Sequence, residues 1–547
     1  MMKKFWRKGL FALLALALFH ETAWAGAVTV LSMNDIHSGL FPVEATVKRD
    51  GREVKEKVGG AAKMISLLER ERAAAPGQTL SLSAGDFTDG ALFYYFNGDP
   101  EILALNRMGW DVSAVGNHEF DHGMIGFRKM LGMLKFPLIS SNLVFRDVSL
   151  NAMVRQTFTK TLADGTKVGV FALMTPELGF VSNITKEGEV RVEQDLAAVA
   201  KEQVRRLREE EGCSVVIALT HIGFENDKLL ASQVTGVNAI VGGHSHTEVP
   251  ELTLVKNPEG MEVPVTQTGA YGRYLGKLVL DVKDGVTQKE GTRWELIDLE
   301  QGVPLESEAA AELKLYDDKL QTELGKAVAV SKDPWDAGKA FVRSRESNVG
   351  SFMADAMRWK TGTDVAFVNG GSIRGDRVYP AGDVSFKMLY TIMPFVNYLN
   401  RLEMTGAQLK EFLENSASCM IVEGDGYDAS TRGATGGFEQ VSGLRVTFDR
   451  KAPPALIDNS GALVRPGSRV TKVELAKADG TYEPLDPAKT YSVTLYKWTA
   501  DGGDKFYSVK GIKSVETYLN NVDVLVEYLK SFDGPFSLPP LGRMIFE

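Results

Sequence analysis

The sequence predicts a two-domain α/β protein, and three observations support this prediction. The chain has 547 residues, which is too long for a single hydrophobic core. In its first half, short runs of β-forming residues alternate with helical stretches, which is typical of a layered α/β domain. A highly charged helical stretch near residue 315 then separates this half from a second unit.

The first half contains six predicted strands and two clear predicted helices. The strands cover residues 28–33, 79–84, 111–115, 167–173, 214–219 and 239–243. The helices cover residues 61–75 and 195–212, and the second ends at Gly212. A β-rich stretch over 277–299 completes the first domain.

These patterns set the expected domain limits. We expect a signal peptide over residues 1–25, a first domain over 26–302, a linker-helix region over 303–334 and a second domain over 335–547. The linker helix itself is predicted between Pro304 and Gly325.

The N-terminus has the features of a secretory signal peptide. Four basic residues among the first eight precede an apolar run from Gly9 to Phe19, and Ala23-Trp24-Ala25 supplies a small-residue cleavage signal. The run is too short to span a bilayer, and no later stretch reaches the roughly 20 apolar residues that a membrane helix needs. We therefore expect an exported protein, periplasmic or extracellular, without stable membrane insertion. An uncleaved anchor is the alternative.

Charge and cysteine content narrow the function classes. Cleavage after Ala25 would remove four positive charges and Glu21, a net +3, and change the formal charge from −9 to −12. Such an acidic chain is a poor nucleic-acid binder, so we expect a small-molecule partner and locally placed positive charge for any phosphate. Cys213 and Cys419 are expected to be separate buried thiols, with a disulfide as the alternative.

Metal-binding residue types follow five of the predicted strands. All six histidines after the signal peptide lie before residue 247. The residues that follow strands are Asp35, His37, Asp86, Asn117, His118, His221, His244 and His246. Because the carboxyl ends of parallel strands meet at one edge of a sheet, we expect these side chains to converge.

The donor types indicate the kind of metal site. Imidazole and carboxylate without thiolate suit Zn, Mn, Fe or Co better than a structural Cys-rich zinc site. Seven of these eight residues, all but His118, are candidate ligands, and seven exceed the four that one tetrahedral ion takes. We therefore expect two divalent ions that share one carboxylate, an arrangement that activates a water for displacement at phosphorus.

These motifs resemble those of a known family. Asp35-x-His37, Gly85-Asp86, Gly116-Asn117-His118-Glu119, His221 and Gly243-His244-Ser245-His246 look like the motif set of the calcineurin-like metallophosphatases. With the second half included, the chain is similar to secreted 5′-nucleotidases and UDP-sugar hydrolases. The resemblance implies a four-layer αββα sandwich, followed by an α+β substrate-binding domain that a linker helix joins to it.

The resemblance also implies the roles of the metal-site residues. One ion would be held by Asp35, His37, Asp86 and His246, and the other by Asp86, Asn117, His221 and His244. His118 and Asp121 would form a catalytic dyad that acts at the phosphoryl oxygen or the leaving group. Glu119 is expected to be a structural acceptor, and His122 to pack in the core or at the rim.

Segments of the second half resemble the substrate-binding domain of the same nucleotidases. They cover residues 343–359, 367–376, 393–399, 436–449 and 499–506. The resemblance implies substrate contacts for Arg345, Asn369, Gly371, Arg374, Phe395 and Phe506. Arg345 and Arg374 would meet the phosphate, with Arg343 as a weaker third candidate, and the two phenylalanines would enclose the nucleobase. Nucleotide-acting relatives place an acid shortly after the second aromatic to hold the ribose, but none follows Phe506 before Glu516. A preference for ribonucleotides is therefore an open question at this point.

The sequence therefore predicts an exported dinuclear-metal phosphohydrolase, monomeric or homodimeric, with its site at the domain interface. It would remove the 5′-phosphate of nucleotides, with UDP-sugars as further substrates. One alternative applies the same chemistry to 2′,3′-cyclic nucleotides, as phosphodiesterase and 3′-nucleotidase, or to a thiosulfate-type ester. Another is an inactive binding or adhesion protein.

Overall fold

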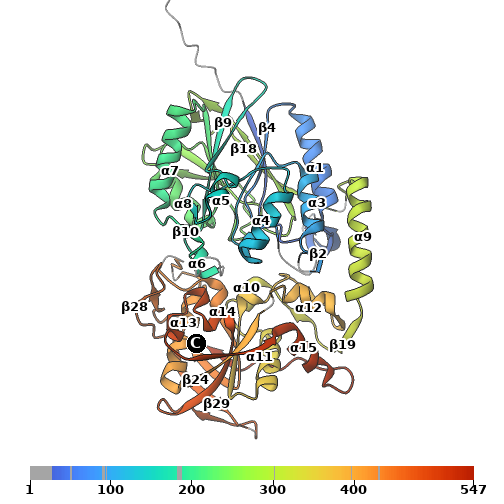
Figure 1. Ribbon diagram of the computed structural model, residues 1–547, viewed down its shortest axis with the longest axis vertical. Coiled ribbons are helices and arrows are strands. Elements are labelled where there is room, and N and C mark those ends of the chain that lie inside the picture. Colours follow the sequence, from blue (N-terminus) through green and yellow to red (C-terminus); the bar gives the residue numbers. More distant parts are fainter. Residues whose placement is uncertain are drawn as a thin grey trace, which may run out of the picture.

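The structure is a computed structural model that describes residues 27–547 except 50–51, 89–92, 94, 182–187, 301, 396, 425, 429–430 and 478. The predicted signal peptide at residues 1–25 lies outside the described residues. Figure 1 shows two domains stacked along the long axis, with helix α9 running along one side of both.

The first domain is built around two six-stranded sheets. The first sheet has the order β18-β15-β1-β4-β5-β6, in which β1, β4, β5 and β6 are parallel, β15 pairs antiparallel with β1, and β18 pairs antiparallel with β15. Its strands are β1 (Val28–Met33), β4 (Thr79–Ser83), β5 (Val112–Ala114), β6 (Leu138–Ile139), β15 (Tyr274–Leu280) and β18 (Arg293–Asp298).

The second sheet has the order β13-β14-β12-β11-β9-β8, in which the four central strands are parallel. Its strands are β8 (Thr157–Thr161), β9 (Lys167–Met174), β11 (Val215–His221), β12 (Ala239–Val241), β13 (Thr253–Lys256) and β14 (Glu262–Thr266). The central strands are apolar runs because both faces of the sheet are covered. All six strands predicted from the sequence are present, with ends that differ by up to two residues.

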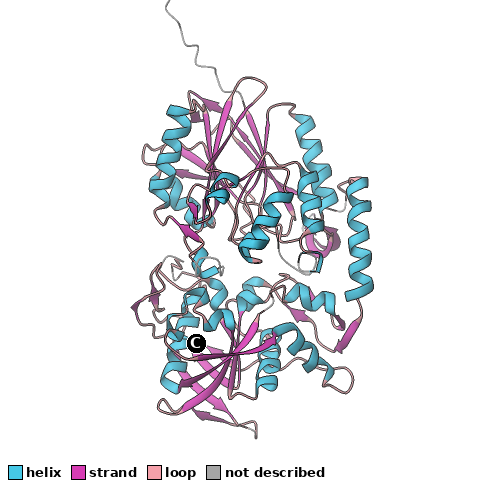
Figure 2. Ribbon diagram, in the orientation of Figure 1, coloured by secondary structure: helices cyan, strands magenta, loops and turns pink. Residues whose placement is uncertain are grey.

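The two sheets pack face to face, and helices cover both outer faces (Figure 2). Side chains such as Val30, Leu82 and Ile217 form the layer between the sheets. The first sheet is covered by α1 (Ala61–Ala74), α3 (Asp99–Met108), α4 (Gly123–Met133) and α9 (Ser307–Leu324). The second sheet is covered by α7 (Leu196–Arg205), which a π-helical turn extends to Glu210, and by α8 (Phe224–Gln233). This is the expected four-layer αββα sandwich.

Helix α9 connects the domains but packs mainly on the first one. Its N-cap, Glu306, accepts the backbone N–H groups of Glu308 and Ala309, which would otherwise lack partners. Its buried residues Ala309, Leu313 and Leu320 belong to the core of the first domain. On the other side, Asp317 pairs with Lys387 of α12 (Phe386–Ile392) at 2.8 Å.

The second domain is α+β. Its five-stranded sheet has the order β25-β21-β31-β24-β32, and a four-stranded sheet has the order β30-β29-β26-β33. The strands are β21 (Val365–Asn369), β24 (Tyr398–Thr405), β25 (Glu439–Ser442), β26 (Leu444–Phe448), β29 (Val470–Ala476), β30 (Tyr482–Pro484), β31 (Thr490–Tyr496), β32 (Ser514–Asn520) and β33 (Met544–Phe546). The remaining helices are α10 (Lys339–Val342), α11 (Asn348–Thr361), α13 (Gly406–Cys419), α14 (Lys497–Ala500) and α15 (Asn521–Lys530).

Short elements complete both domains. Pairs of strands are formed by β2 (Val43–Arg49) with β3 (Arg52–Val58), β7 (Leu143–Phe145) with β10 (Val190–Val192), β16 (Val282–Lys283) with β17 (Val286–Thr287), β19 (Ala327–Ser331) with β23 (Gly382–Ser385), β20 (Trp335–Asp336) with β22 (Val378–Tyr379), and β27 (Leu456–Ile457) with β28 (Leu463–Arg465). Two short helices are α5 (Val148–Met153) and α6 (Leu178–Val181).

Cys213 and Cys419 are both buried free thiols, which confirms the prediction of two separate thiols. Cys213 lies in the core of the first domain and Cys419 in a core cluster of the second. Within the described part of the chain, no helix combines the length and the apolar character that crossing a membrane requires.

Candidate metal centre and adjoining cavity

All seven candidate metal ligands lie at the ends of central strands of the first domain. Asp35 and His37 follow β1, Asp86 follows β4, and Asn117 follows β5. On the second sheet, His221 is the last residue of β11, and His244 and His246 follow β12. The carboxyl ends of these parallel strands meet at one edge of the sandwich, so the side chains gather there as expected.

The backbone at this edge is strained. Five of the seven residues have positive φ angles: Asp35 (51°), His37 (44°), Asp86 (52°), His244 (81°) and His246 (59°). Non-glycine residues rarely adopt this left-handed region, which costs about 1–3 kcal/mol for each residue and persists where the surroundings fix it. Backbone hydrogen bonds fix it here, since Asp35 N–H donates to Gly85 O and His37 N–H to Asp86 O, both at 3.0 Å.

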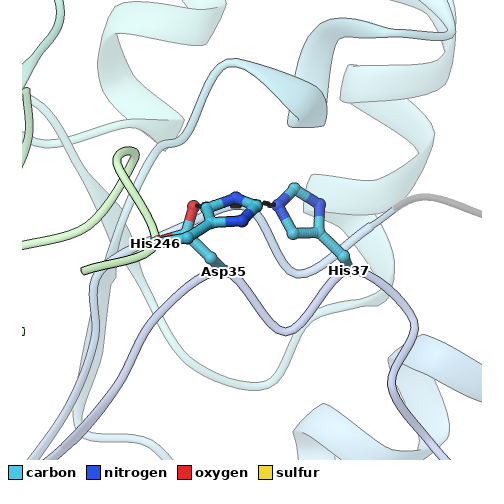
Figure 3. Close-up of side chains that lie close together, drawn as sticks. All are labelled: Asp35, His37 and His246. Atoms are coloured by element: carbon cyan, nitrogen blue, oxygen red, sulfur yellow. Dashed lines mark hydrogen bonds and ion pairs between the residues drawn. The ribbon is translucent and has the colours of Figure 1, made fainter. Parts of the chain in front are cut away.

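Asp35, His37 and His246 direct their ligand atoms toward one another (Figure 3). The Nε2 atoms of the two histidines are 2.9 Å apart, and Asp35 Oδ1 is 3.7 Å from His37 Nε2 and 3.4 Å from His246 Nε2. Ligands of a tetrahedral ion are about 3.3 Å apart when bonds are about 2.0 Å long. Asp35 Oδ1 is buried and accepts no hydrogen bond. This group fits a metal ion.

A second group contains Asp86, Asn117, His221 and His244. His221 Nε2 is 3.0 Å from Asp86 Oδ2 and 3.2 Å from Asn117 Oδ1, which is itself 2.9 Å from His244 Nδ1. His221 Nδ1 lies 2.7 Å from the carbonyl oxygen of Ala84, to which it donates as the Nδ1–H tautomer. That tautomer leaves Nε2 free to bind a metal.

Asp86 lies between the two groups. Its Oδ2 atom is 3.0 Å from His221 Nε2, 3.9 Å from His37 Nε2 and 4.0 Å from His118 Nε2. Its Oδ1 atom accepts the backbone N–H of His118 at 2.8 Å. Burial raises the pKa of Asp86, but the charges of His221 and His118 outweigh burial and hold the pKa well below its ordinary value. A carboxylate at this position can serve both groups.

The histidines differ in their charge states. Burial, followed by the charge of His221, lowers the pKa of His244 to about 3. Burial likewise holds the pKa values of His37 and His246 well below the ordinary value, with Arg374 contributing in both cases. These three rings are therefore neutral, which is the form that binds metals. Burial lowers the pKa of His221, but Asp86 outweighs it and raises the pKa to about 10, so a metal ion would displace the proton on Nε2 to bind there.

Glu119 supports the loops that carry the ligands. Its carboxylate accepts the backbone N–H groups of Asp86 and Phe87, both at 3.0 Å, and of Gly116 at 2.6 Å. Glu119 thus joins the loop after β4 to the loop after β5, which confirms the expectation of a structural acceptor.

His118 and Asp121 form a close pair beside the ligands. His118 Nδ1 is 2.6 Å from Asp121 Oδ2. Burial lowers the pKa of His118, but the charges of Asp121 and Asp86 outweigh burial and raise the pKa to about 9. The neighbouring His122 packs its ring against Phe93 with 4.7 Å between centroids and lines the cavity, as expected for a rim residue.

A cavity of about 820 Å³ lies between the domains and is lined by residues of the metal centre and of the second domain. The second domain supplies three cations to its wall: Lys339, Arg343 and Arg374. Arg374 Nη2 is 3.3 Å from His118 Nε2, and Lys339 Nζ donates to Ser245 O at 3.3 Å. Burial, followed by Arg343 and Arg374, lowers the pKa of Lys339 to about 7. Lys339 cannot be predicted from the sequence, because a single lysine near a helix start carries no distinctive signal.

The structure places Arg343 at this wall and leaves Arg345 outside it. Arg345 is exposed and its guanidinium lies 5.4 Å from the ring centroid of Phe341. The helical turn of α10 continues past its end, since the N–H of Arg345 donates to Phe341 O at 3.2 Å. Residues two apart in a helical turn point to opposite sides, so only one of the two arginines can face the cavity. The expectation for Arg345 is corrected in favour of Arg343.

Phe506 is also not part of the cavity wall. Its side chain is 2% exposed and its ring centroid lies 4.7 Å from that of Phe412 in the core. Asp504 and Lys505 have left-handed φ angles of 54° and 63°, and the chain reverses there, so that Phe506 turns inward. The expected pairing of Phe506 with Phe395 is not formed.

Trp498 and Asp504 line the cavity instead, together with Phe395 and Asn369. Asp504 Oδ2 accepts hydrogen bonds from Asn369 Nδ2 at 3.1 Å and from Trp498 Nε1 at 3.3 Å. Counted from Trp498, an acid follows six residues later, whereas none follows Phe506 before Glu516. In the sequence, this spacing between an aromatic residue and an acid favours Trp498 over Phe506 as the second aromatic residue of the site.

Two glycines allow the backbone to form part of this wall. A Cβ atom on Gly371 would lie 2.9 Å from the Cα atom of Gly436, so the two backbones can approach this closely only as glycines. Both residues line the cavity.

Comparison with known proteins gives consistent matches over both domains. Residues 28–248 match the calcineurin-like phosphoesterase family, and residues 327–511 match the 5′-nucleotidase C-terminal domain. The chain is 31% identical to the 5′-nucleotidase of Bos taurus, over 91% of this chain and 87% of that protein. It is 30% identical to the trifunctional nucleotide phosphoesterase protein YfkN of Bacillus subtilis, of which it covers only 35%. The crystal structure of a 5′-nucleotidase precursor from Thermus thermophilus has a TM-score of 0.83 and 30% identity, over 95% of this chain and 99% of that one.

Proposed function

Since the chain belongs to the 5′-nucleotidase family of metal-dependent phosphoester hydrolases, we propose that it removes the 5′-phosphate of nucleotides and releases nucleoside and phosphate. The observation that carries this proposal is the 3.3 Å approach of Arg374 to His118. An arginine of the second domain that lies this close to the candidate metal ligands of the first domain supports a phosphate-binding site between the domains.

We propose that two divalent ions, Zn, Mn, Co or Fe, bind at this centre. Asp35, His37, Asp86 and His246 would hold one ion, and Asp86, Asn117, His221 and His244 the other. Ions bound here would supply Lewis-acid stabilisation of the phosphoryl oxygens and activate a water molecule for attack on phosphorus. The support is the neutral state of three histidines and the central position of Asp86 Oδ2.

The cations of the second domain would bind the transferring phosphoryl group. Arg343 and Arg374 present guanidinium groups that can each donate two hydrogen bonds to phosphate oxygens, and Lys339, whose pKa is about 7, adds positive charge when it is protonated. Because Arg374 is buried, Lys339 and Arg343 are partly buried, and all three are positioned before substrate binds, they can stabilise charge that develops during the reaction.

His118 would act as the general acid. Asp121, with Oδ2 2.6 Å from His118 Nδ1, would orient the ring and stabilise its protonated form. His118 Nε2 faces the cavity beside Arg374, where it can donate a proton to the ester oxygen as the nucleoside leaves.

The nucleoside would occupy the part of the cavity lined by Phe395, Trp498 and Asp504. Stacking on aromatic rings tolerates different bases and contributes about 1–3 kcal/mol for each base. The Asp504 carboxylate can accept hydrogen bonds from ribose hydroxyls, which supplies the acid missing after Phe506. We therefore propose a preference for ribonucleotides over 2′-deoxynucleotides.

These observations also distinguish the proposed function from the alternatives that the sequence allows. Family membership favours an enzyme over an inactive binding protein. Asp504 and the aromatic side chains favour a nucleotide over a thiosulfate-type ester, whereas UDP-sugars and 2′,3′-cyclic nucleotides would use the same cavity. Export and a monomeric or homodimeric state stay predictions from the sequence.

A substrate panel tests the proposal. Phosphate release from AMP, UMP and dAMP would be measured with Mn, Zn, Co or EDTA, and 2′,3′-cyclic AMP and UDP-glucose would be followed by product chromatography. We expect metal-dependent hydrolysis of the monophosphates, with AMP preferred over dAMP, and loss of activity in Asp86→Asn. Turnover of the cyclic nucleotide alone would replace the nucleotidase proposal with the phosphodiesterase alternative.

A further inference from the structure

A buried ion pair crosses the domain boundary away from the metal centre. Glu177 belongs to the first domain, three residues after β9 and immediately before α6. Lys505 belongs to the second domain and ends the turn Gly503–Lys505, which packs against α6. Lys505 Nζ lies 3.4 Å from Glu177 Oε1, and the two side chains are 0% and 10% exposed.

Lys505 provides the main positive charge that stabilises the Glu177 carboxylate. Burial raises the pKa of Glu177, Lys505 lowers it, and the acids Asp504 and Asp428 raise it further. The pair exists only while the domains are in contact, since separation would expose Glu177 to water and leave Lys505 with partners of the second domain such as Asn459 Oδ1 at 3.4 Å. Substitution of one partner would leave the other charge buried without compensation in the contact arrangement, which is costly. Loss of either side chain is therefore expected to disfavour the arrangement in which the domains are in contact.

The position of Lys505 connects this contact to the cavity. Lys505 directly follows Asp504, and both residues hold left-handed φ angles of 54° and 63°. The carbonyl oxygen of Lys505 accepts a hydrogen bond from Asn415 Nδ2 at 3.3 Å, which fixes the same turn. Glu177 and Asp504 both line the cavity. The Glu177–Lys505 contact is therefore one peptide unit away from the acid that would face the nucleoside.

We propose that Glu177 and Lys505 are positioning residues that couple recognition of the sugar at Asp504 to closure of the two domains over the metal centre. The proposal rests on the proposed nucleotidase function for the identity of the sugar. With the domains in contact, Arg374 Nη2 lies 3.3 Å from His118 Nε2, so the coupling would make assembly of the phosphate site depend on correct occupation of the nucleoside site.

Domain closure can be measured directly. Cysteines introduced at the exposed residues Val148 and Val464, one in each domain, can carry a fluorescent donor and acceptor, while the native thiols are buried. Energy transfer would be recorded on metal-free protein with adenosine or 2′-deoxyadenosine in wild type, E177Q, K505M and the double variant. We expect adenosine to increase the closed fraction in wild type, and each single variant to weaken its apparent affinity by at least about fivefold.

Two measurements distinguish a loss of coupling between the ion pair and the sugar site from a general loss of stability. The ratio of adenosine to 2′-deoxyadenosine affinity should fall in both single variants, and the two substitutions should be clearly non-additive in the double variant. A merely destabilised fold would weaken both nucleosides equally. The control is D317N, which removes the more exposed pair of Asp317 with Lys387 at the same domain boundary and should change affinity by less than about twofold.

Several outcomes would overturn the proposal: closure by adenosine that is equal in wild type and E177Q, an unchanged nucleoside ratio, or additive effects of the two substitutions. If K505M does not fold, E177Q alone still decides, because it leaves the Asp504 turn intact. If wild type neither hydrolyses nucleotides nor binds adenosine, the proposed function fails. In that case, energy transfer without any ligand would be compared in wild type and E177Q, to test whether the Glu177–Lys505 pair favours domain contact. Identical distributions in the two proteins would refute this role of the pair.

Discussion

Asp86 and Glu119 show how single residues build this site from buried carboxylates. Glu119 is satisfied by three backbone N–H groups and connects two loops, so it has a structural task. Asp86 uses one oxygen for the N–H of His118 and directs the other at three histidine rings. The two residues are joined by a hydrogen bond from the Asp86 N–H to the Glu119 carboxylate. Only the partners of the two carboxylates differ: those of Glu119 are backbone N–H groups, so it holds the loops together, whereas Asp86 also faces histidine rings and can bind metal.

Arg343 and Arg345 provide a matched pair for a test at the same scale. Arg343 lines the cavity, and Arg345 lies outside it on the opposite side of the turn. We expect Arg343→Ala to lower kcat/KM for AMP by about 100-fold, because a charge-assisted contact to phosphate is lost. Steady-state kinetics of R343A and R345A would be compared, with R345A retaining activity within about threefold. A larger loss in R345A than in R343A would contradict the assignment.

The sequence predicted which side chains gather at the sheet edge better than it predicted which residues line the rest of the cavity, for a physical reason. Asp35, His37 and Asp86 follow apolar strands, and parallel strands deliver their ends to one edge whatever the details of the loops. Arg343 and Trp498 lie in short helical turns, where a shift of two residues reverses the side of the chain that faces the cavity. The left-handed conformation of Asp504, which turns Phe506 into the core, leaves no mark in composition or periodicity.

At the scale of elements, β11 and α8 form a unit behind the metal centre. Asp227 of α8 is fully buried, and its Oδ1 atom accepts the hydroxyl of Thr220 at 2.6 Å, while Oδ2 accepts no hydrogen bond. Burial raises the pKa of Asp227 to about 8, against smaller opposing effects of Thr220 and His221. Asp227 is therefore protonated at neutral pH in the folded protein.

This protonation gives a signed pH dependence of stability. An unfolded aspartate loses its proton near pH ~4, so the folded state binds more protons between about pH 4 and pH 8. The stability that Asp227 contributes is therefore present below about pH 4 and is lost as the pH rises toward 8. Asp227→Asn should gain stability relative to wild type over this window, by at least about 1 kcal/mol, in urea unfolding of metal-free protein. Glu225→Gln on the exposed side of α8 is the control, and parallel pH profiles for D227N and wild type would contradict the prediction.

At the scale of the whole molecule, the candidate ligands come from both sheets of the sandwich. Asp35, His37, Asp86 and Asn117 follow strands of the first sheet, and His221, His244 and His246 belong to the second. Ions bound at this edge would join the two sheets where their loops carry strained backbone angles. Metal binding is therefore expected to stabilise the folded chain as well as to support turnover.

Metal removal tests this expectation. Saturation at about 100 times Kd would add about 2.7 kcal/mol to the free energy of unfolding, so EDTA should lower Tm and Mn or Zn should restore it. Thermal unfolding of wild type and Asp86→Asn would be followed with and without metal. The variant lacks the carboxylate common to both groups and should show a much smaller shift. An equal shift in both proteins would show that the stabilising ions bind elsewhere.

The strand order of the first sheet also determines when the metal centre can form during synthesis. β1 carries the first two candidate ligands, but it lies between β4 and β15, and β15 pairs in turn with β18. Tyr271 N–H donates to Asp35 O at 2.8 Å, which ties the first ligand loop to a segment translated more than 230 residues later. Domains commonly fold as units from the N-terminus during translation. The ligand made first therefore reaches its final geometry only after residues 271–298 have emerged, close to the end of the first domain, so any ion captured earlier would meet an incomplete binding site.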